Sequence, residues 1–196
     1  MTEIWAIILA AGESNRMQSN KLLLPLHGKT LIETVIEHVR QADIEHILVV
    51  SGAFSDAILP VIGKLPVLHC HNSEYKKGML SSVQCGFKNI VGSPEAVIIF
   101  PGDLPEIPGE VTNKLINDYR NSVKGIVIPV YKGHRGHPLL IDWKYRHVID
   151  KLDPAVGLRD LLFNYPGDVL EVNVDMPGIL KDIDTLQDYR DLIKSK

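Results

Sequence analysis

The sequence has little cysteine and no long hydrophobic run, and both features exclude whole classes of protein. Cys70 and Cys85 are the only two cysteines among 196 residues, and they form no C-x-x-C pair. This excludes a disulfide-stapled secreted domain and a cysteine-based zinc site, and a reducing compartment fits best. The apolar stretch from Ile4 to Ala11 is too short to span a bilayer and follows no basic leader. We therefore expect a cytoplasmic protein with no membrane partner.

An excess of positive charge is also missing. The formal net charge is -3, so we expect no broad electrostatic contact with nucleic acid. The composition, 45% apolar and 23% charged, is ordinary for a folded protein, and the length predicts a single domain over residues 1–196. Arg16, Lys21 and Lys29 nevertheless crowd the amino-terminal part, where a local anion site could form.

Apolar runs alternate with amphipathic stretches along most of the chain. The apolar runs predict strands at residues 4–10, 46–51, 67–71, 96–100, 125–131, 138–141 and 169–174. The amphipathic stretches predict helices at residues 31–41, 55–62, 78–89, 109–119, 158–163 and 186–193. Strands that are apolar on both sides indicate a mostly parallel sheet with helices on both faces. We predict a three-layer, Rossmann-like α/β fold, in which ligands bind beyond the carboxyl ends of the strands.

The loop after the first predicted strand carries the strongest chemical pattern. It reads L-A-A-G-E-S-N-R-M-Q-S-N-K-L-L-L-P-L-H-G-K-T-L. The small residues Ala10, Ala11 and Gly12 let the backbone approach a ligand, and its N–H groups can then surround phosphate oxygens. Arg16 and Lys21 would supply the positive charge that stabilises a departing pyrophosphate. The loop matches neither the G-x-G-x-x-G dinucleotide fingerprint nor the G-x-x-x-x-G-K-[ST] Walker loop.

Two acidic segments are candidates for binding a metal ion. Asp103 follows the strand A-V-I-I-F inside P-G-D-L-P, where two prolines and Gly102 fix the backbone. Mg²⁺ prefers oxygen ligands and typically takes one or two carboxylates plus phosphate oxygens. The alternative for Asp103 is a turn-capping role. In K-D-I-D-T, alternation puts Asp182 and Asp184 on one side and Ile183 on the other. We interpret Asp182 as a metal or substrate ligand and Asp184 as the N-cap of the last helix.

Three further segments predict sites for anionic ligands. Ser81 and Ser82 lie at the start of a predicted helix, where hydroxyls and free N–H groups suit a nucleotide or phosphate; plain helix capping is the alternative. Arg135 and His137, in R-G-H-P, could hold the phosphate and ring system of an acceptor, or could simply shape a tight hairpin. Arg159 follows a glycine turn and is a further candidate phosphate contact.

Together these segments resemble the signature of the molybdenum cofactor cytidylyltransferases, within the MobA-like nucleotidyltransferase superfamily. The resemblance rests on L-A-A-G-x-S-x-R-M-x-x-x-K-L-L-L-P-x-x-G-K, N-S-E-Y-K-K-G-M-L-S-S-V-Q-C-G-F, P-G-D-L-P, R-G-H-P and D-I-D-T-x-x-D-Y, in the expected order. Gln18 departs from the glycine that is common in the family after R-M, and Leu158 departs from a frequent alanine.

The resemblance implies a nucleotide-diphospho-sugar transferase type of fold and a reaction. CMP would pass from CTP to molybdenum-molybdopterin, with Mg²⁺ as cofactor and pyrophosphate released, for the maturation of a molybdenum hydroxylase. Catalysis would fall to Arg16, Lys21 and Asp103. Nucleotide binding would fall to Leu9, Ala10, Ala11, Gly12, Lys21, Ser81, Ser82 and Gly102. The metal would be held by Asp103 and Asp182, and the acceptor by Arg135, His137 and Arg159.

Two other functions remain open from the sequence. A nucleotidyltransferase that acts on a sugar or polyol phosphate shares the L-A-A-G start, and the R-G-H-P segment discriminates against it. A non-catalytic carrier of the molybdenum cofactor would need no metal, so Asp103 and Lys21 argue against that role. Ala11 favours CTP over GTP, because related guanylyltransferases read L-A-G-G and the extra methyl group takes up room beside the base.

Overall fold

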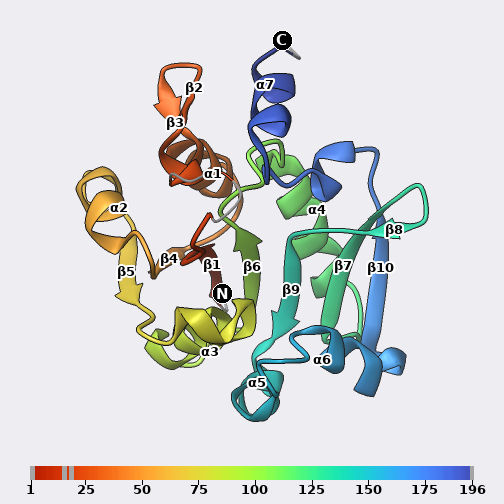
Figure 1. The fold of residues 1–196 in the computed structure, drawn as a ribbon. Helices are drawn as coiled ribbons and strands as arrows, with labels where there is room; N and C mark the ends of the chain where they lie inside the picture. Colours follow the sequence, from red (N-terminus) through yellow and green to blue (C-terminus); the bar gives the residue numbers. More distant parts are fainter. Residues whose placement is uncertain (1–2, 15–16, 18–19, 195–196) are drawn as a thin grey trace.

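The computed structural model describes residues 3–14, 17 and 20–194. Its strands are β1 (Ile4–Ala10), β2 (Pro25–Leu26), β3 (Lys29–Thr30), β4 (His46–Ser51), β5 (Leu68–His71), β6 (Ala96–Pro101), β7 (Ile126–Tyr131), β8 (His134–Arg135), β9 (Leu139–Asp142) and β10 (Val169–Asn173). Eight of them form one sheet in the order β10-β7-β9-β6-β1-β4-β5, with β8 paired to β7 (Figure 1). The remaining two, β2 and β3, form a small antiparallel hairpin.

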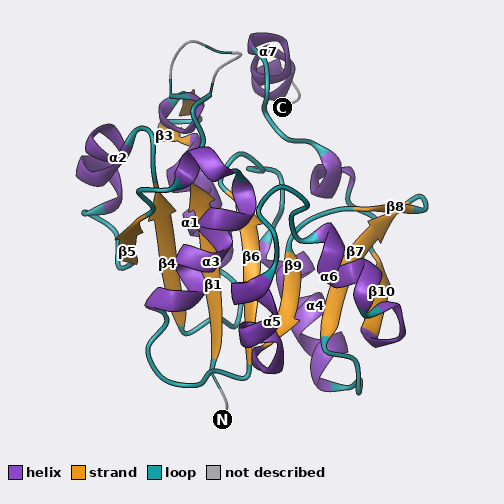
Figure 2. Cartoon of the chain, turned by 60° about the horizontal axis from the view of Figure 1, so that its bottom comes forward, coloured by secondary structure: helices purple, strands orange, loops and turns teal. Residues whose placement is uncertain are grey.

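Helices cover both faces of this sheet (Figure 2). They are α1 (Leu31–Arg40), α2 (Ser55–Ile62), α3 (Met79–Asn89), α4 (Gly109–Arg120), α5 (Arg146–Lys151), α6 (Arg159–Asn164) and α7 (Leu186–Lys194). The apolar sides of α1, α2 and α4 pack on one face, and those of α3, α5 and α6 pack on the other. The three-layer α/β prediction is therefore confirmed. In the described part of the chain, no helix combines the length and apolarity needed to cross a membrane.

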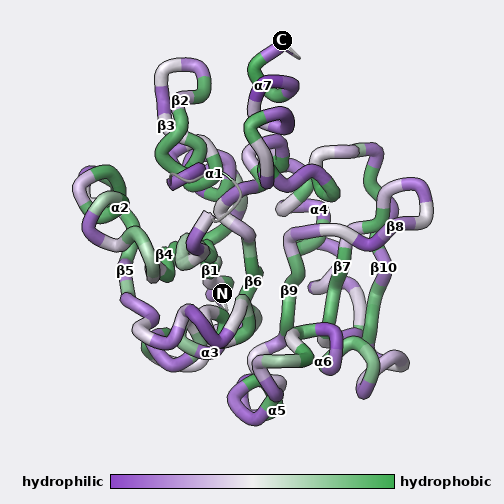
Figure 3. The backbone as a smooth tube through the Cα atoms, viewed as in Figure 1, coloured by the Kyte–Doolittle hydropathy of each residue, from purple (hydrophilic) through white to green (hydrophobic). Residues whose placement is uncertain are grey.

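Strand β1 shows why the sheet is buried on both sides. Ile4, Ala6 and Ile8 point into the core formed with α1, α2 and α4, whereas Trp5 and Ile7 point into the other core. All five side chains are at most 4% exposed. An uninterrupted apolar run is therefore what a central strand covered on two faces requires. Figure 3 shows the same apolar character in the neighbouring strands.

The pairing of the strands brings several loops to one edge of the sheet. Strand β1 lies between β4 and β6 and is parallel to both, so the loops after β1 and β6 leave the sheet side by side. Strand β9 is antiparallel to β6, with Leu139 opposite Ile99. Residues that precede β9 therefore reach the same edge as residues that follow β6.

Every strand and helix predicted from the sequence is present, with ends that differ by at most one residue. The sequence did not predict α5, the β2–β3 hairpin or the short strand β8. The segment between the strands predicted at residues 125–131 and 138–141 contains β8, which pairs with the end of β7. Thr30 begins α1 with a capping box, because its hydroxyl accepts the Glu33 N–H while the Glu33 carboxylate accepts the Thr30 N–H.

Candidate active site

The loops that follow β1 and β6 pack closely at the edge of the sheet. The Gly102 N–H donates to the Leu9 carbonyl at 2.9 Å. A Cβ atom at Gly102 would lie 2.8 Å from that oxygen, so only glycine permits this approach. Ala11 is buried and its carbonyl accepts the Ala53 N–H. Gly12, in contrast, has open space where a side chain would stand. The loop after β1, which we call the phosphate loop, therefore faces a pocket at this point.

A pocket of about 470 Å³ opens beside these loops. It is bordered by the loop after β1, the 3-10 helix Lys21–Leu23, the start of α3 and the loop after β6. Predicted nucleotide-binding residues on its wall are Leu9, Ala11, Gly12, Lys21 and Ser82. Ala10 and Gly102 are not among the residues that line the pocket. Tyr75 and Lys76 also line the pocket, and our sequence analysis did not single them out.

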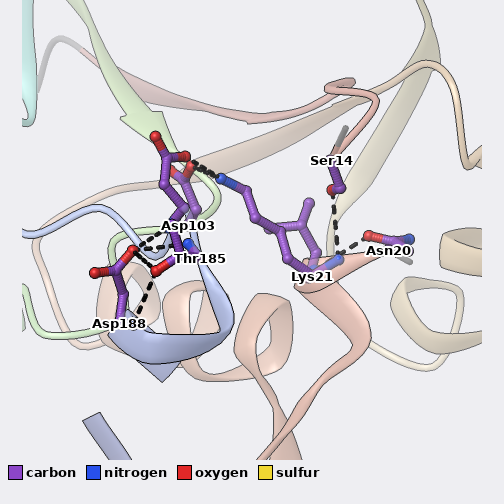
Figure 4. Close-up of polar contacts among 8 residues, drawn as sticks. Ser14, Asn20, Lys21, Asp103, Thr185 and Asp188 are labelled. Atoms are coloured by element: carbon purple, nitrogen blue, oxygen red, sulfur yellow. Dashed lines mark hydrogen bonds and ion pairs between the residues drawn. The ribbon is translucent and has the colours of Figure 1, made fainter. Parts of the chain in front are cut away.

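Lys21 lies at the centre of a partly buried charge cluster in this pocket. Its ammonium nitrogen is 2.6 Å from Asp103 Oδ2 and 2.8 Å from Asp184 Oδ1 (Figure 4). The side chain of Lys21 is only 14% exposed. Two carboxylates from distant parts of the chain thus converge on one cation, so the pocket concentrates negative charge at a fixed point.

The backbone around Lys21 is held by short polar contacts. The Asn20 side chain accepts the Leu22 N–H at 3.1 Å and so caps the 3-10 helix. The Ser14 hydroxyl accepts the Lys21 N–H at 3.4 Å, which ties this helix back to the phosphate loop (Figure 4). These two hydrogen bonds therefore hold the backbone that carries the Lys21 side chain.

Burial and charge act on the pKa values of the groups in this cluster. Burial by itself would lower the pKa of Lys21, but the adjacent Asp103 and Asp184 carboxylates outweigh it, and the pKa is raised. Burial also raises the pKa of Asp182, and the negative charges of Asp184 and Asp103 add to this effect. Burial lowers the pKa of His137, although Asp103 and Asp182 oppose that shift. These interactions indicate that Asp182 and His137 adjoin the cluster.

The role predicted for Asp184 as a helix cap is wrong. The N-cap of α7 is Thr185, whose hydroxyl accepts the Asp188 N–H at 3.2 Å. The Asp188 carboxylate accepts the Thr185 N–H in return, and also the Asp184 N–H. Thr185 therefore occupies the N-cap position, and the Asp184 carboxylate contacts the Lys21 ammonium. Ile183 points inward as predicted, and its N–H donates to the Asp103 carbonyl at 3.1 Å.

Carboxylates are the residues of this site that could hold a metal ion. Asp103 and Asp184 face one point, and Asp182 lies near both. Within residues 3–14, 17 and 20–194, no group of three His, Cys, Asp or Glu side chains is arranged as a complete metal site. Mg²⁺ typically takes one or two carboxylates and completes its shell with phosphate oxygens and water.

Asn72 organises the start of α3. It is 4% exposed, and its amide nitrogen donates to Ser81 Oγ at 2.9 Å and to Ser82 Oγ at 3.0 Å. The Ser81 hydroxyl is directed at the carbonyls of Glu74 and Gly78. Ser81 is thus engaged inside the protein, and only Ser82 reaches the pocket wall. Asn72 is the positioning residue here, although the sequence analysis assigned the site to the two serines.

A second and larger cavity, of about 870 Å³, contains all three predicted acceptor-binding residues: Arg135, His137 and Arg159. Most of its wall is apolar and comes from β7, β9, α6 and the loop before α6, including Ile128, Leu162 and Phe163. Phe163 is 81% exposed at this cavity. Met79 lines both the large cavity and the smaller pocket, so the two are neighbours.

The polar residues of the large cavity differ in how they are held. Arg135 is paired with Glu171, with 2.7 Å between Nε and Oε1. Arg159 makes no ion pair with any other residue that the structure describes. Gly136 must be glycine, because a Cβ atom there would lie 2.5 Å from the Ile179 carbonyl. The Nδ1 atom of His137 is buried and has no hydrogen-bond partner among the described residues, so this ring can still accept one.

Arg16 and Gln18 lie outside the described residues, so the predicted catalytic role of Arg16 stays a prediction. The cluster of Lys21, Asp103 and Asp184 lies entirely within the described residues. Its groups come from three loops and offer one cation, a carboxylate pair and open backbone, which is what the transfer of a phosphoryl group requires.

Known proteins have sequences similar to this chain. The chain is 28% identical to the molybdenum cofactor cytidylyltransferase of Escherichia coli over 189 residues, which cover 96% of this chain and 95% of that protein. It is 34% identical to a probable molybdenum cofactor guanylyltransferase of Natranaerobius thermophilus over 129 residues, which cover 66% of this chain and 61% of that protein.

Solved structures show the same fold. The crystal structure of Rv0371c from Mycobacterium tuberculosis superposes with a TM-score of 0.86 at 24% identity, covering 99% of this chain and 98% of that one. The same protein in complex with manganese gives a TM-score of 0.82 at 22% identity, with 100% of both chains covered.

A match to a family profile over most of the sequence identifies the family of this chain. The profile of the MobA-like NTP transferase domain matches residues 6–170, which include the phosphate loop, Asp103 and the segment before β9. The fold, the charge cluster and this match agree, so the chain belongs to the MobA-like NTP transferase family and is a nucleotidyltransferase.

Proposed function

We propose that this protein transfers CMP from CTP to molybdenum-molybdopterin and releases pyrophosphate. The observation that carries the proposal is the pair of adjoining cavities. The more polar of the two contains Lys21 and Asp103, and the more apolar one contains Arg135 and Arg159. A nucleoside triphosphate suits the first, and a flat ring system with a phosphate group suits the second.

In this mechanism the acceptor phosphate attacks the α-phosphorus of CTP in line. A bond forms between an acceptor oxygen and the α-phosphorus, and the bond from that phosphorus to the bridging α–β oxygen breaks. Pyrophosphate leaves with the electron pair, and no proton transfer is needed because the acceptor phosphate is already ionised. Lys21 neutralises charge on the departing group, while the backbone at Gly12 orients the phosphates. Arg135 and Arg159 hold the acceptor in place.

The carboxylates fit a magnesium cofactor. Asp103 and Asp184 already converge on a single cationic nitrogen, and their oxygens are the ligands that Mg²⁺ prefers. We infer that Asp103 holds the ion, with Asp184 or Asp182 as the second protein ligand. When bound, the ion would neutralise the charge that develops on the transferred phosphoryl group.

The acceptor assignment draws on the relative that matches nearly the whole chain. That protein is a molybdenum cofactor cytidylyltransferase, whereas the guanylyltransferase relative matches a shorter part. We infer that the product serves the maturation of a molybdenum hydroxylase in the cytoplasm.

The proposal is tested by incubating the purified chain with each nucleoside triphosphate, Mg²⁺ and isolated molybdenum-molybdopterin. Pyrophosphate release and the mass of the product are measured. We expect pyrophosphate and a cytosine dinucleotide with CTP. A preference for GTP would instead make the chain a guanylyltransferase. Turnover only with a sugar or polyol phosphate would reject the acceptor, and tight cofactor binding without pyrophosphate release would favour a carrier.

A further inference from the structure

Two thiols that are 15 residues apart in the sequence lie next to each other between β5 and α3. The Sγ atoms of Cys70 and Cys85 are 3.8 Å apart, and both cysteines are free. Cys70 is 8% exposed on an edge strand of the sheet, and Cys85 is partly exposed on the helix. A disulfide bond is about 2.05 Å long, so its formation needs the sulfurs to approach by roughly 2 Å.

We propose that Cys70 and Cys85 form a redox modification site, in which a two-electron oxidation joins them in a reversible disulfide that weakens nucleotide binding. The existence of the disulfide depends only on the two thiols. Its effect on the nucleotide rests on the proposed function.

The chemistry begins at Cys85, because this sulfur is the more exposed of the two. The Asn89 amide lies 3.8 Å from it and can donate to a charged sulfur. Burial raises the pKa of Cys70 to about 12, with the neighbouring Cys85 adding to the effect, so Cys70 stays a thiol at neutral pH. Cys85 is therefore the first thiol to react and Cys70 the resolving one.

Hydrogen peroxide is an oxidant that balances the reaction. The Cys85 thiol first loses its proton, and the thiolate attacks one peroxide oxygen. The O–O bond breaks, the other oxygen leaves as hydroxide and takes up that proton to become water, and Cys85 becomes a sulfenic acid. The Cys70 sulfur then attacks the Cys85 sulfur, the S–O bond breaks, and a second water carries away the Cys70 proton. The two thiols lose two electrons in total, and the peroxide gains them.

The disulfide would act on the nucleotide pocket through residues on the same two elements. Asn72 follows Cys70 by two residues, and its amide holds the hydroxyls of Ser81 and Ser82. Those serines precede Cys85 by one turn of α3. Drawing the two sulfurs together therefore shifts the segment that positions Ser82 on the pocket wall. A displacement of about 1 Å in a positioning segment can reduce activity by roughly 10²-fold.

The test treats the full chain with hydrogen peroxide, alkylates the remaining thiols under denaturing conditions and measures the mass. CTP binding in the presence of Mg²⁺ is titrated before and after oxidation, and again after reduction with dithiothreitol. We expect an intramolecular disulfide with no alkylation, and a dissociation constant for CTP raised about tenfold or more and restored by reduction. In the control variant Cys85→Ser, peroxide should leave the CTP dissociation constant unchanged.

The outcomes separate the two proposals. Two alkylated thiols after oxidation, a sulfinic acid on Cys85 alone, or a disulfide between two chains would each overturn the modification site. An intramolecular disulfide with unaltered CTP binding would overturn the coupling to the pocket. Failure of the reduced chain to bind CTP would count against the proposed function, while the mass measurement still decides whether the disulfide forms.

Discussion

Asp103 faces the Lys21 ammonium at 2.6 Å, directly beyond the end of β6. The change Asp103→Asn keeps the shape of this side chain and removes its charge. Because that charge would hold the metal ion, we expect kcat/KM to fall by at least about 10²-fold. Pyrophosphate release over a range of Mg²⁺ concentrations measures this. The matched control is Asp118→Asn, which alters an exposed carboxylate paired with Lys114 on α4. Near-normal turnover of folded Asp103→Asn at limiting Mg²⁺ would reject the assignment.

A substitution of the single residue Ala11 tests the choice of nucleotide. Its methyl group is 5% exposed, and its backbone borders the pocket. We expect Ala11→Gly to lower the ratio of kcat/KM for CTP to that for GTP by about tenfold, since one methyl group in a pocket is worth that much. Ala53→Gly nearby should leave the ratio unchanged. An unaltered ratio in Ala11→Gly would mean that this methyl group only packs against its neighbours.

Lys21 changes one expectation from the sequence. An exposed lysine contributes little to folding, so we expected Lys21→Ala to reduce catalysis more than folding stability. The structure shows instead a side chain that is 14% exposed and bonded to two carboxylates 82 and 163 residues away in the chain. No periodicity or spacing links residues so far apart. The phosphate loop and Asp103 could be predicted separately, but their convergence on Lys21 could not.

The correction at Asp184 has a similar origin. Asp184 and Thr185 are adjacent, and both residue types are good N-caps, so the sequence does not decide between them. The fold decides, because the Ile183 N–H binds the Asp103 carbonyl and places the following residue beside Lys21. Tyr75 and Lys76 are a different case. They lie in the N-S-E-Y-K-K-G-M segment on which the resemblance rests, and that signal was available.

At the scale of single elements, α1 has a capping box that makes its stability depend on pH. Two hydrogen bonds from Thr30, first from its hydroxyl and then from its backbone N–H, lower the pKa of Glu33. Because the pKa of Glu33 is lower in the folded chain than its ordinary value of 4.5, the ionised carboxylate stabilises the fold above pH 4.5. This contribution to stability is lost as the pH falls through the folded-state pKa of Glu33. We expect Glu33→Ala to lower the free energy of unfolding by about 1 kcal/mol at neutral pH.

Urea unfolding at several pH values measures this difference. It should be constant near neutrality and shrink below the ordinary pKa of Glu33. Glu110→Ala, an exposed substitution in the first turn of α4, is the matched control and should show a smaller effect. A difference for Glu33→Ala that stays the same down to acid unfolding would contradict the role of the carboxylate.

Helix α6 carries the prediction for the acceptor. Phe163 is a large apolar side chain at a cavity with two arginines and is 81% exposed. If it stacks on the ring of the acceptor, Phe163→Ala should raise the KM for molybdenum-molybdopterin about tenfold and leave the KM for CTP unchanged. Phe163→Tyr should retain most of the activity. Val123→Ala, which alters a side chain that is 92% exposed on another surface, is the control. Equal changes in both KM values would argue for a general loss of structure.

For the whole molecule, the metal ion should be needed for turnover but not for the fold. The described carboxylates already have Lys21 as a counter-charge, so the cluster is neutralised in part without an ion. We expect EDTA to stop pyrophosphate release, and Mg²⁺ to restore it, while the unfolding temperature changes little. Unfolding of the wild-type chain by EDTA would show that the ion is structural.

The architecture was the part most open to prediction, because strands such as β1, β4 and β6 are continuous apolar runs that only a doubly covered sheet explains. Helix α5 was missed because it has six residues and mixes charges with apolar positions. The pairing of β9 could not be predicted from the sequence either. The short run L-L-I-D can pair with a parallel or an antiparallel strand, and the neighbouring strands and intervening loops determine which pairing forms.

Strand β9 runs antiparallel to both of its neighbours, β6 and β7, and this has a consequence for how such proteins can diversify. Under the proposed function, the sheet has a donor half, from β6 to β5, and an acceptor half, from β9 to β10, which are joined along one strand pair. Sequence changes between residues 126 and 170 can then alter which molecule is modified, while the machinery that activates the triphosphate is inherited intact. Exchanging residues 126–170 between relatives should therefore exchange acceptor preference as a block.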